Sequence, residues 1–226
     1  MFLRAFFILL LLSGCGRPLT ENETAYLATL HGDALDADKV RLGKGALVGS
    51  VTFRRKARPR VACRERILPP VTDEIVTAKP AAVALFNRVH FTKDWYLPEY
   101  LPGYPERLYL IRTMLFAHEM THVWQWQNRA QTGYSPLRAA AEHGATDDPY
   151  LFDLDSTPDF LAFGFEQQGA IVEEYVCCRA LAPQAARTQR LHEMLKGAFP
   201  VSDLPRGPES NVFLPWKDLD LGGICT

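Results

Sequence analysis

The stretch that decides the fold is MLFAHEMTHVWQWQ, Met114 to Gln127. It lies inside a longer run, from Glu106 to about Arg129, that contains no proline or glycine, so we expect one continuous helix. One face of that helix carries residues spaced by three or four positions: Ile111, Leu115, His118, His122 and Trp126. Two histidines therefore share an otherwise apolar face, where each imidazole needs a polar partner.

A metal ion is the partner that this spacing favours. His118 and His122 stand one turn apart, so both can place a nitrogen about 2.0–2.1 Å from one ion. Glu119 is rotated by about 100° from His118, which puts its carboxylate beside that ion as a base. This is the H-E-x-x-H arrangement of zinc peptidases. The alternative is a solvated helix whose two histidines have ordinary hydrogen-bond partners, and the apolar face argues against it.

A catalytic zinc also needs a third protein ligand and an open position for water. Gln125 and Asn128 stand where the metzincin pattern requires glycine and histidine, so that class is excluded. We expect the third ligand to be Glu166, in the second long helical run, FEQQGAIVEEYVCCRAL. The E-x-x-x-A of Glu166 to Ala170 resembles the third-ligand helix of the gluzincins, the thermolysin-like class.

The resemblance extends to a group of poorly characterised bacterial metallopeptidases, whose members typically read HE-x-THVWQ and EQQA. Here the motifs are HEMTHVWQ and EQQG, so Gly169 stands where that group often has alanine. Only these two helices carry specific motifs, although the likeness covers most of the mature chain loosely. The resemblance implies an α+β fold, with a small antiparallel sheet packed on a zincin-like pair of helices that bring His118, His122 and Glu166 together.

Other carboxylates compete with Glu166. Glu173 and Glu174 are expected to be carboxylates on a solvated helical face. The alternative for Glu173, two turns from Glu166 on the same face, is to orient a histidine. Asp153 or Asp155 as the ligand would move the chain to an aspartate-ligand class. The residue that stabilises an oxyanion stays open among five candidates: Tyr134, His143, Tyr150, Tyr175 and His192.

These residues predict a peptidase that uses Zn²⁺ and hydrolyses peptide or protein substrates. Glu119 would take a proton from the attacking water and pass it to the leaving amine. By resemblance, the strand around Val83 to Phe91 would line the cleft and pair with an extended peptide. The alternative is a non-catalytic envelope lipoprotein that uses the fold as a binding or structural module. A peptide-sized groove that reaches the metal would distinguish the two.

The N-terminal run MFLRAFFILLLLSGCG has the features of a secretory signal: Arg4, then an apolar run too short to span a bilayer, then small residues. Leu12 to Cys15 resembles the bacterial lipobox, in which the cysteine is acylated and becomes the first residue. We therefore predict a signal peptide at 1–14, a lipidated tether at 15–19 and a single metallopeptidase domain at 20–226. Gly16 favours the outer membrane, with the domain facing the periplasm. The alternative is a plain signal peptide with an incidental cysteine.

The composition excludes several classes of protein. The chain has 226 residues, which suits one domain, and a net charge of −1, which argues against a general nucleic-acid binder. Its most basic stretch, Arg54 to Arg66, is expected to be a solvated loop, with contact to anionic lipid head groups as the alternative. The sequence does not fix the oligomeric state.

The remaining cysteines predict disulfides, since an exported chain meets an oxidising compartment. Cys63, Cys177, Cys178 and Cys225 allow three pairings. A bond between the neighbours Cys177 and Cys178 would be strained, so we favour one of them bonding to Cys63 or Cys225. No second cysteine pair stands at the spacing of a zinc finger.

Weaker patterns predict the other elements. A capping box at Thr20 to Glu23 should begin a helix that ends near Gly32. The second long helix should start at a Thr157 cap or after Gly164. We expect short strands at Lys39–Leu42, Ala46–Phe53 and Tyr150–Leu154, a strand or hairpin at Ala82–Trp95, a loop at Gly133–Pro149 and a helix at Gln184–Lys196.

The lipobox gives a direct test. Replacing Cys15 with serine should abolish incorporation of labelled fatty acid and move the protein from the membrane to the soluble fraction, because the acylated thiol is gone. Labelling and cell fractionation measure both effects. A wild-type chain without acyl label would make Cys15 an ordinary residue.

Overall fold

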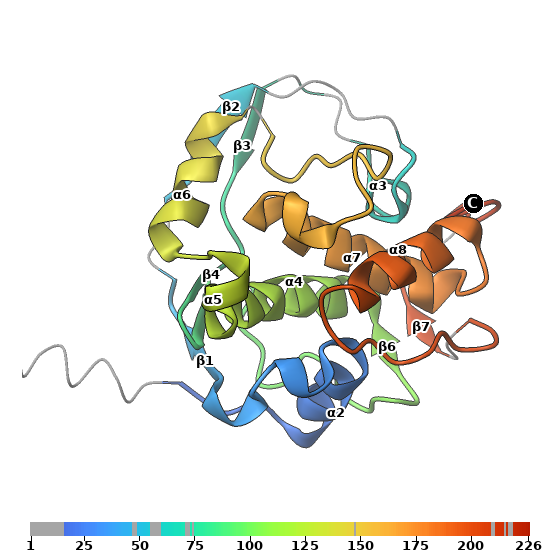
Figure 1. Cartoon of the computed structure of the whole chain (residues 1–226), viewed down its shortest axis with the longest axis horizontal. Helices are drawn as coiled ribbons and strands as arrows, with labels where there is room; N and C mark the ends of the chain where they lie inside the picture. Colours follow the sequence, from blue (N-terminus) through green and yellow to red (C-terminus); the bar gives the residue numbers. More distant parts are fainter. Residues whose placement is uncertain are drawn as a thin grey trace, which may run out of the picture.

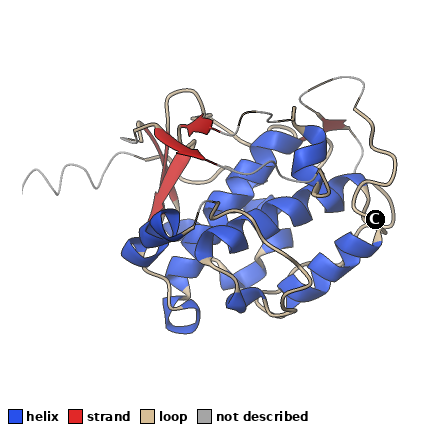
Figure 2. Ribbon diagram, turned by 90° about the horizontal axis from the view of Figure 1, so that it is seen from above, coloured by secondary structure: helices blue, strands red, loops and turns tan. Residues whose placement is uncertain are grey.

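Two long helices, α4 (Leu110–Gln127) and α7 (Phe165–Leu181), pack against each other at the centre of the structure (Figure 1). The computed structural model of the chain describes residues 16–46, 49–54, 60–70, 73, 75–146, 148–208, 211–214, 216 and 219–226. The predicted signal peptide and Cys15 lie outside these residues. Figure 2 shows the strands gathered beside a body made mainly of helices, which confirms the α+β class.

Helix α4 is buried on nearly all sides rather than along a single face. Thr113, Thr121 and Gln125 are fully buried together with the apolar residues around them. The two threonines are satisfied within the helix, because their hydroxyls donate to the carbonyls of Tyr109 and Ala117 one turn earlier. The helix starts at Leu110 rather than Glu106, since the two preceding residues form strand β6 (Leu108–Tyr109).

The sheet that packs beside α4 is mixed. Strands β4 (Ala82–Leu85) and β5 (Arg88–Phe91) form the expected antiparallel hairpin, but β1 (Arg41–Lys44) pairs with β5 in parallel. The expectation of an antiparallel sheet is therefore wrong at β1. A parallel pair needs a long crossover, and the segment between β1 and β4 provides it. The strand order is β1-β5-β4.

The remaining elements surround this centre. Helix α2 begins with the expected capping box, in which Thr20 and Glu23 bond each other's backbone. Strands β2 and β3 pair in antiparallel fashion, and β6 pairs with β7 in parallel. No described helix is long and apolar enough to cross a bilayer. The bounds are α2 Glu21–Leu30, η2 Gly32–Ala34, η3 Ala37–Lys39, β2 Val51–Arg54, α3 Cys63–Ile67, β3 Ile75–Ala78, α5 Arg129–Thr132, α6 Pro136–Ala145, η4 Phe160–Ala162, α8 Ala186–Lys196 and β7 Val212–Phe213.

Helix α6 replaces most of the loop expected at Gly133–Pro149. Ser135 caps it by accepting from the Arg138 N–H, and Pro136 occupies the first helical turn. Proline fits there because its missing N–H would have no helical partner. The expected strand at Tyr150–Leu154 is also absent, since these residues are irregular. Helix α7 begins after Gly164, the later of the two expected starts.

Two disulfides fix other segments to α7. Cys63 bonds Cys177, and Cys178 bonds Cys225. The expectation that one of the two neighbouring cysteines bonds to Cys63 or Cys225 is therefore confirmed, and the structure gives each of them such a partner. The first bond holds α3 against α7, and the second holds the C-terminal segment there.

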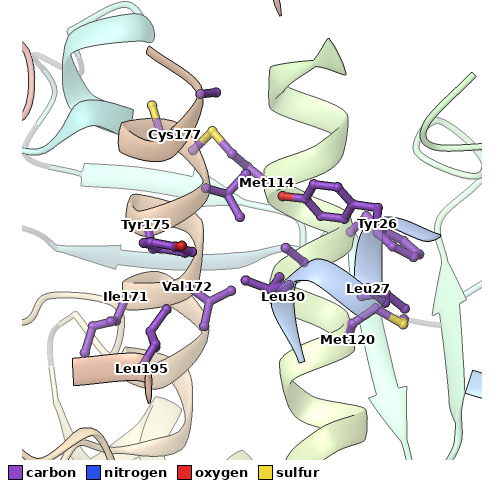
Figure 3. Packing of buried hydrophobic residues seen from close by; sticks show 14 of the residues in the cluster. Tyr26, Leu27, Leu30, Met114, Met120, Ile171, Val172, Tyr175, Cys177 and Leu195 are labelled. Carbon is purple, nitrogen blue, oxygen red and sulfur yellow. The ribbon is translucent and has the colours of Figure 1, made fainter. Parts of the chain in front are cut away.

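The larger of two apolar clusters among the described residues joins the helices (Figure 3). Tyr26, Leu27 and Leu30 of α2 meet Met114 and Met120 of α4, with Ile171, Val172, Tyr175 and Leu195 from α7 and α8. His31 is fully buried at its edge, with its ring centroid 4.7 Å from that of Phe199. Neither ring nitrogen of His31 has a hydrogen-bond partner among the described residues. Burial accordingly lowers its pKa to about 3, so it is neutral in the folded protein.

His31 should make the fold sensitive to acid. The unfolded chain protonates this histidine near its usual pKa, whereas the folded protein cannot, so stability is lost as the pH falls below that value. We expect about 1.4 kcal/mol of lost unfolding free energy per pH unit between about pH 6 and pH 4. His31→Leu should remove this loss. Urea unfolding of both proteins across this range measures the free energy of unfolding at each pH. Subtracting the value for His31→Leu from that for wild type removes the contribution of the other titrating groups. If the unfolding free energies of the two proteins change in parallel with pH, His31 is not the source of the acid sensitivity.

Candidate metal centre

Three buried side chains bring their donor atoms together where α4 meets the first turn of α7. The Nε2 atoms of His118 and His122 are 3.1 Å apart, and Oε2 of Glu166 lies 3.3 Å from the first and 3.5 Å from the second. Bonds of about 2.0–2.1 Å at tetrahedral angles place ligand atoms roughly 3.3–3.4 Å apart. The triangle therefore has the size that one tetrahedral ion requires, and this group could hold a metal ion.

A network of glutamines orients His122. Its Nδ1 lies 2.8 Å from Oε1 of Gln125, whose amide nitrogen donates to the Phe165 carbonyl and to Oε1 of Gln168. The amide oxygen of Gln125 can therefore only accept, so we assign the proton of His122 to Nδ1. The lone pair of Nε2 then points at the centre of the triangle. Sequence reasoning missed Gln125, although it is the last residue of the HVWQ motif.

A carboxylate orients His118 in the same sense. Its Nδ1 lies 3.1 Å from Oε1 of Glu173, an ion pair outside the alignment of a regular hydrogen bond. The other oxygen of Glu173 is 2.6 Å from Nη1 of Arg64. Glu173 thus takes the alternative, orienting position. The lone pairs of His118 and His122 now face each other at 3.1 Å, an arrangement that a shared cation stabilises.

The charges around the triangle also favour a cation. Burial opposes a charged His118, but its contacts with Glu166 and Glu173 outweigh burial and raise its pKa to about 10. Burial likewise opposes ionisation of Glu166, yet His122, His118 and His143 hold its pKa well below the usual value. The carboxylates therefore favour positive charge at the imidazoles, which a bound proton or a divalent ion can supply.

Glu119 stands apart from this network. It is 6% exposed, and no hydrogen bond reaches its carboxylate from the residues that the structure describes. Burial raises its pKa, although the neighbouring histidines oppose the shift. A carboxylate that is unpaired and harder to ionise than usual is suited to accept a proton.

Helix α6 supports Glu166 from the other side. The carboxylate of Glu142 accepts from the backbone N–H groups of Phe165 and Glu166, at 2.9 and 3.1 Å, and so caps the start of α7. Nε2 of His143 lies 3.2 Å from Oε1 of Glu166. The Ser135–Pro136 pair was the available signal for this helix, but no sequence pattern links Glu142 to a helix so far along the chain.

The structure separates the oxyanion candidates. The ring of Tyr150 lies 6.0 Å from that of His118 and 5.9 Å from that of His143. Tyr134 stacks 6.2 Å from His122. Burial raises the pKa of both tyrosines, which keeps them neutral donors. Two other candidates pack together in the core, away from the triangle, because the ring of His192 stacks on that of Tyr175.

The competing carboxylates have other partners. Asp155 pairs with Arg190, and Asp153 accepts from the Asp155 N–H, so neither joins the triangle. Glu173 and Glu174 are both buried, so the expectation of a solvated face is wrong, and Glu174 binds Arg187 at 2.6 Å.

Gly169 allows the close approach of the two helices. A Cβ at this position would lie 2.6 Å from Cε1 of His118, closer than atoms can pack. The imidazole therefore lies directly on the backbone of α7. Gly169, which stands where the resembling group often has alanine, thus leaves room for this ring.

Comparison with known proteins identifies one structural counterpart. No family model matches the chain. It is 26% identical over 185 residues to the type VI secretion system spike protein VgrG2b of Pseudomonas aeruginosa, which covers 82% of this chain but only 15% of that much longer protein. The solved effector domain of VgrG2b superposes with a TM-score of 0.51 and 22% identity, over 83% of this chain and 86% of that domain. The chain therefore shares the fold of that effector domain.

Gln125 offers a test of the metal centre that leaves all three donor residues in place. Gln125→Leu should weaken zinc binding by about 10- to 100-fold, because His122 loses the acceptor that fixes its Nδ1 proton. Gln127→Leu, two residues along the same helix and bonded to Asp36, should bind zinc normally. Competition with a chromophoric chelator measures both affinities. Equal zinc affinity in the two variants would show that Gln125 does not orient the metal ligand His122.

Proposed function

We propose that this chain is a zinc-dependent peptidase of the gluzincin type. The observation that carries the proposal is the triangle of His118, His122 and Glu166, whose sides fit one tetrahedral zinc. Glu119 lies beside it with no other partner among the described residues. The resemblance of both helix motifs to bacterial metallopeptidases supports the same reading.

The roles of the residues follow from their positions. Nε2 of His118, Nε2 of His122 and a carboxylate oxygen of Glu166 would hold the ion. Zinc supplies Lewis acidity and lowers the pKa of water to about 7 when bound. Glu119 accepts the proton of the attacking water and delivers it to the leaving amine. His143 and Tyr150 lie next to the triangle, where a donor can stabilise negative charge on the carbonyl oxygen.

The proposal also covers the cellular location and the substrate. The lipobox supports export and a lipid anchor at Cys15, on the outer membrane and facing the periplasm. Peptides or proteins are the substrates that the proposed chemistry requires. The free β4 edge of the three-stranded sheet supports pairing with an extended chain, because an edge strand offers unpaired backbone groups.

One observation favours the non-catalytic alternative. His118, Glu119, His122 and Glu166 are only 5 to 8% exposed. A peptide can reach them only if the surrounding segments, such as α6 or the residues around Tyr150, shift. Turnover must therefore be measured together with metal content.

Glu119→Gln separates the two functions. It should retain zinc and lose at least about 10²-fold of peptide hydrolysis, because the base is gone while the ligands remain. His118→Ala should lose zinc and hydrolysis together. Glu193→Gln, on the exposed side of α8, is the matched control and should behave as wild type. Digestion of an unbiased peptide library, with zinc measured on the same samples, reports both properties. If wild type and Glu119→Gln both hold zinc and neither cleaves any peptide, the metal-bearing binding module replaces the peptidase.

A further inference from the structure

Arg64 is the outermost member of a chain of contacts that ends at the metal centre. Its guanidinium lies 2.6 Å from Oε2 of Glu173, whose other oxygen lies 3.1 Å from Nδ1 of His118. The Arg64 side chain is 41% exposed, whereas that of Glu173 is 8% exposed. The pair therefore joins the protein surface to a buried carboxylate that touches a proposed zinc ligand.

The Cys63–Cys177 disulfide runs beside this ion pair. Cys63 and Arg64 are neighbours at the start of α3, and Cys177 follows Glu173 by one turn on α7. Residues four positions apart share one face of a helix, so the covalent bond and the ion pair both start from one face of α7 and reach two consecutive residues of α3. The backbone N–H of Cys63 also donates to Oε2 of Glu174 at 2.8 Å. The disulfide thus fixes the segment that presents Arg64.

Glu173 needs Arg64 because burial makes a lone carboxylate unfavourable. Arg64 and His118 together hold the pKa of Glu173 below its usual value against the effect of burial. With Arg64 in place, one oxygen of Glu173 is occupied and the other faces His118. Without it, the carboxylate can rotate, and the orientation of the His118 ring is no longer fixed.

We propose that Arg64 is a positioning residue of the metal centre, and that the Cys63–Cys177 disulfide holds it in place. Zinc affinity therefore depends on a covalent bond outside the ligand set. This inference rests on the metal site of the proposed function, but not on its catalytic activity. The ordinary alternative is a surface ion pair that contributes little beyond local stability.

The test compares zinc affinity in single and combined variants. Arg64→Ala and the Cys63→Ser/Cys177→Ser double variant should each bind zinc about 10-fold more weakly than wild type. Their combination should bind no more weakly than the poorer of the two, because both act through Glu173. Serine variants are used instead of a reductant, since free thiols would themselves bind zinc. Arg64→Lys should recover part of the affinity, because it keeps the charge.

Two controls match these variants. Arg66→Ala removes a neighbouring arginine that binds the carbonyls of Asp220 and Gly222, away from the metal centre. Cys178→Ser/Cys225→Ser removes the other disulfide. Both should keep wild-type affinity. The absorption spectrum of bound Co²⁺ should change in Arg64→Ala but not in Arg66→Ala, because it reports the geometry of the ligands. Thermal melting shows whether each variant is folded.

The outcomes are distinct. Wild-type zinc affinity and an unchanged Co²⁺ spectrum in folded Arg64→Ala would overturn the positioning role, and so would losses that multiply in the combined variant. In either case the zinc site itself would stand. A wild-type chain that binds no zinc would overturn this inference and the proposed function together.

Discussion

The contact between two buried imidazoles is the constraint on which the rest of the structure depends. Nε2 of His118 and Nε2 of His122 face each other at 3.1 Å, inside a helix whose neighbours are almost all buried. Two lone pairs at this distance repel each other unless a proton or a metal ion lies between them. Helix α7 places the carboxylate of Glu166 opposite the pair, which favours such a positive charge. The packing of α4 on α7 therefore brings charged and polar groups together as well as apolar ones.

Several buried polar groups near this contact are satisfied by residues from different segments. Gln168 supports Gln125, Glu142 caps the start of α7, and Glu173 pairs with Arg64. Such a network orders the site only when it is complete, because a half-satisfied group in a low dielectric costs more than it contributes. The elements around α4 and α7 therefore act as supports for side chains as well as covers for the core.

The sequence predicted the part of this arrangement that lies within single helices. The His118–Glu119–His122 spacing, the Thr20 capping box and the β4–β5 hairpin are local patterns, and each forms as expected. Glu166 was identified through its motif, and the structure brings it to the histidines. Contacts between distant segments could not be read in the same way. Nothing near Arg64 indicates Glu173, and a basic stretch was expected to be solvated or to face lipid.

The contact between Gln125 and Gln168 has a consequence for how such chains diverge. One glutamine ends the histidine motif and the other belongs to the glutamate motif, and they bond at 2.9 Å in the buried interior. Replacing Gln125 alone leaves the buried Oε1 of Gln168 without this donor, and replacing Gln168 alone removes one of the two acceptors of the Gln125 amide nitrogen. The two motifs therefore depend on each other. We expect related chains to keep both glutamines or to replace both together. A chain that has lost only one of them should have a weaker metal site.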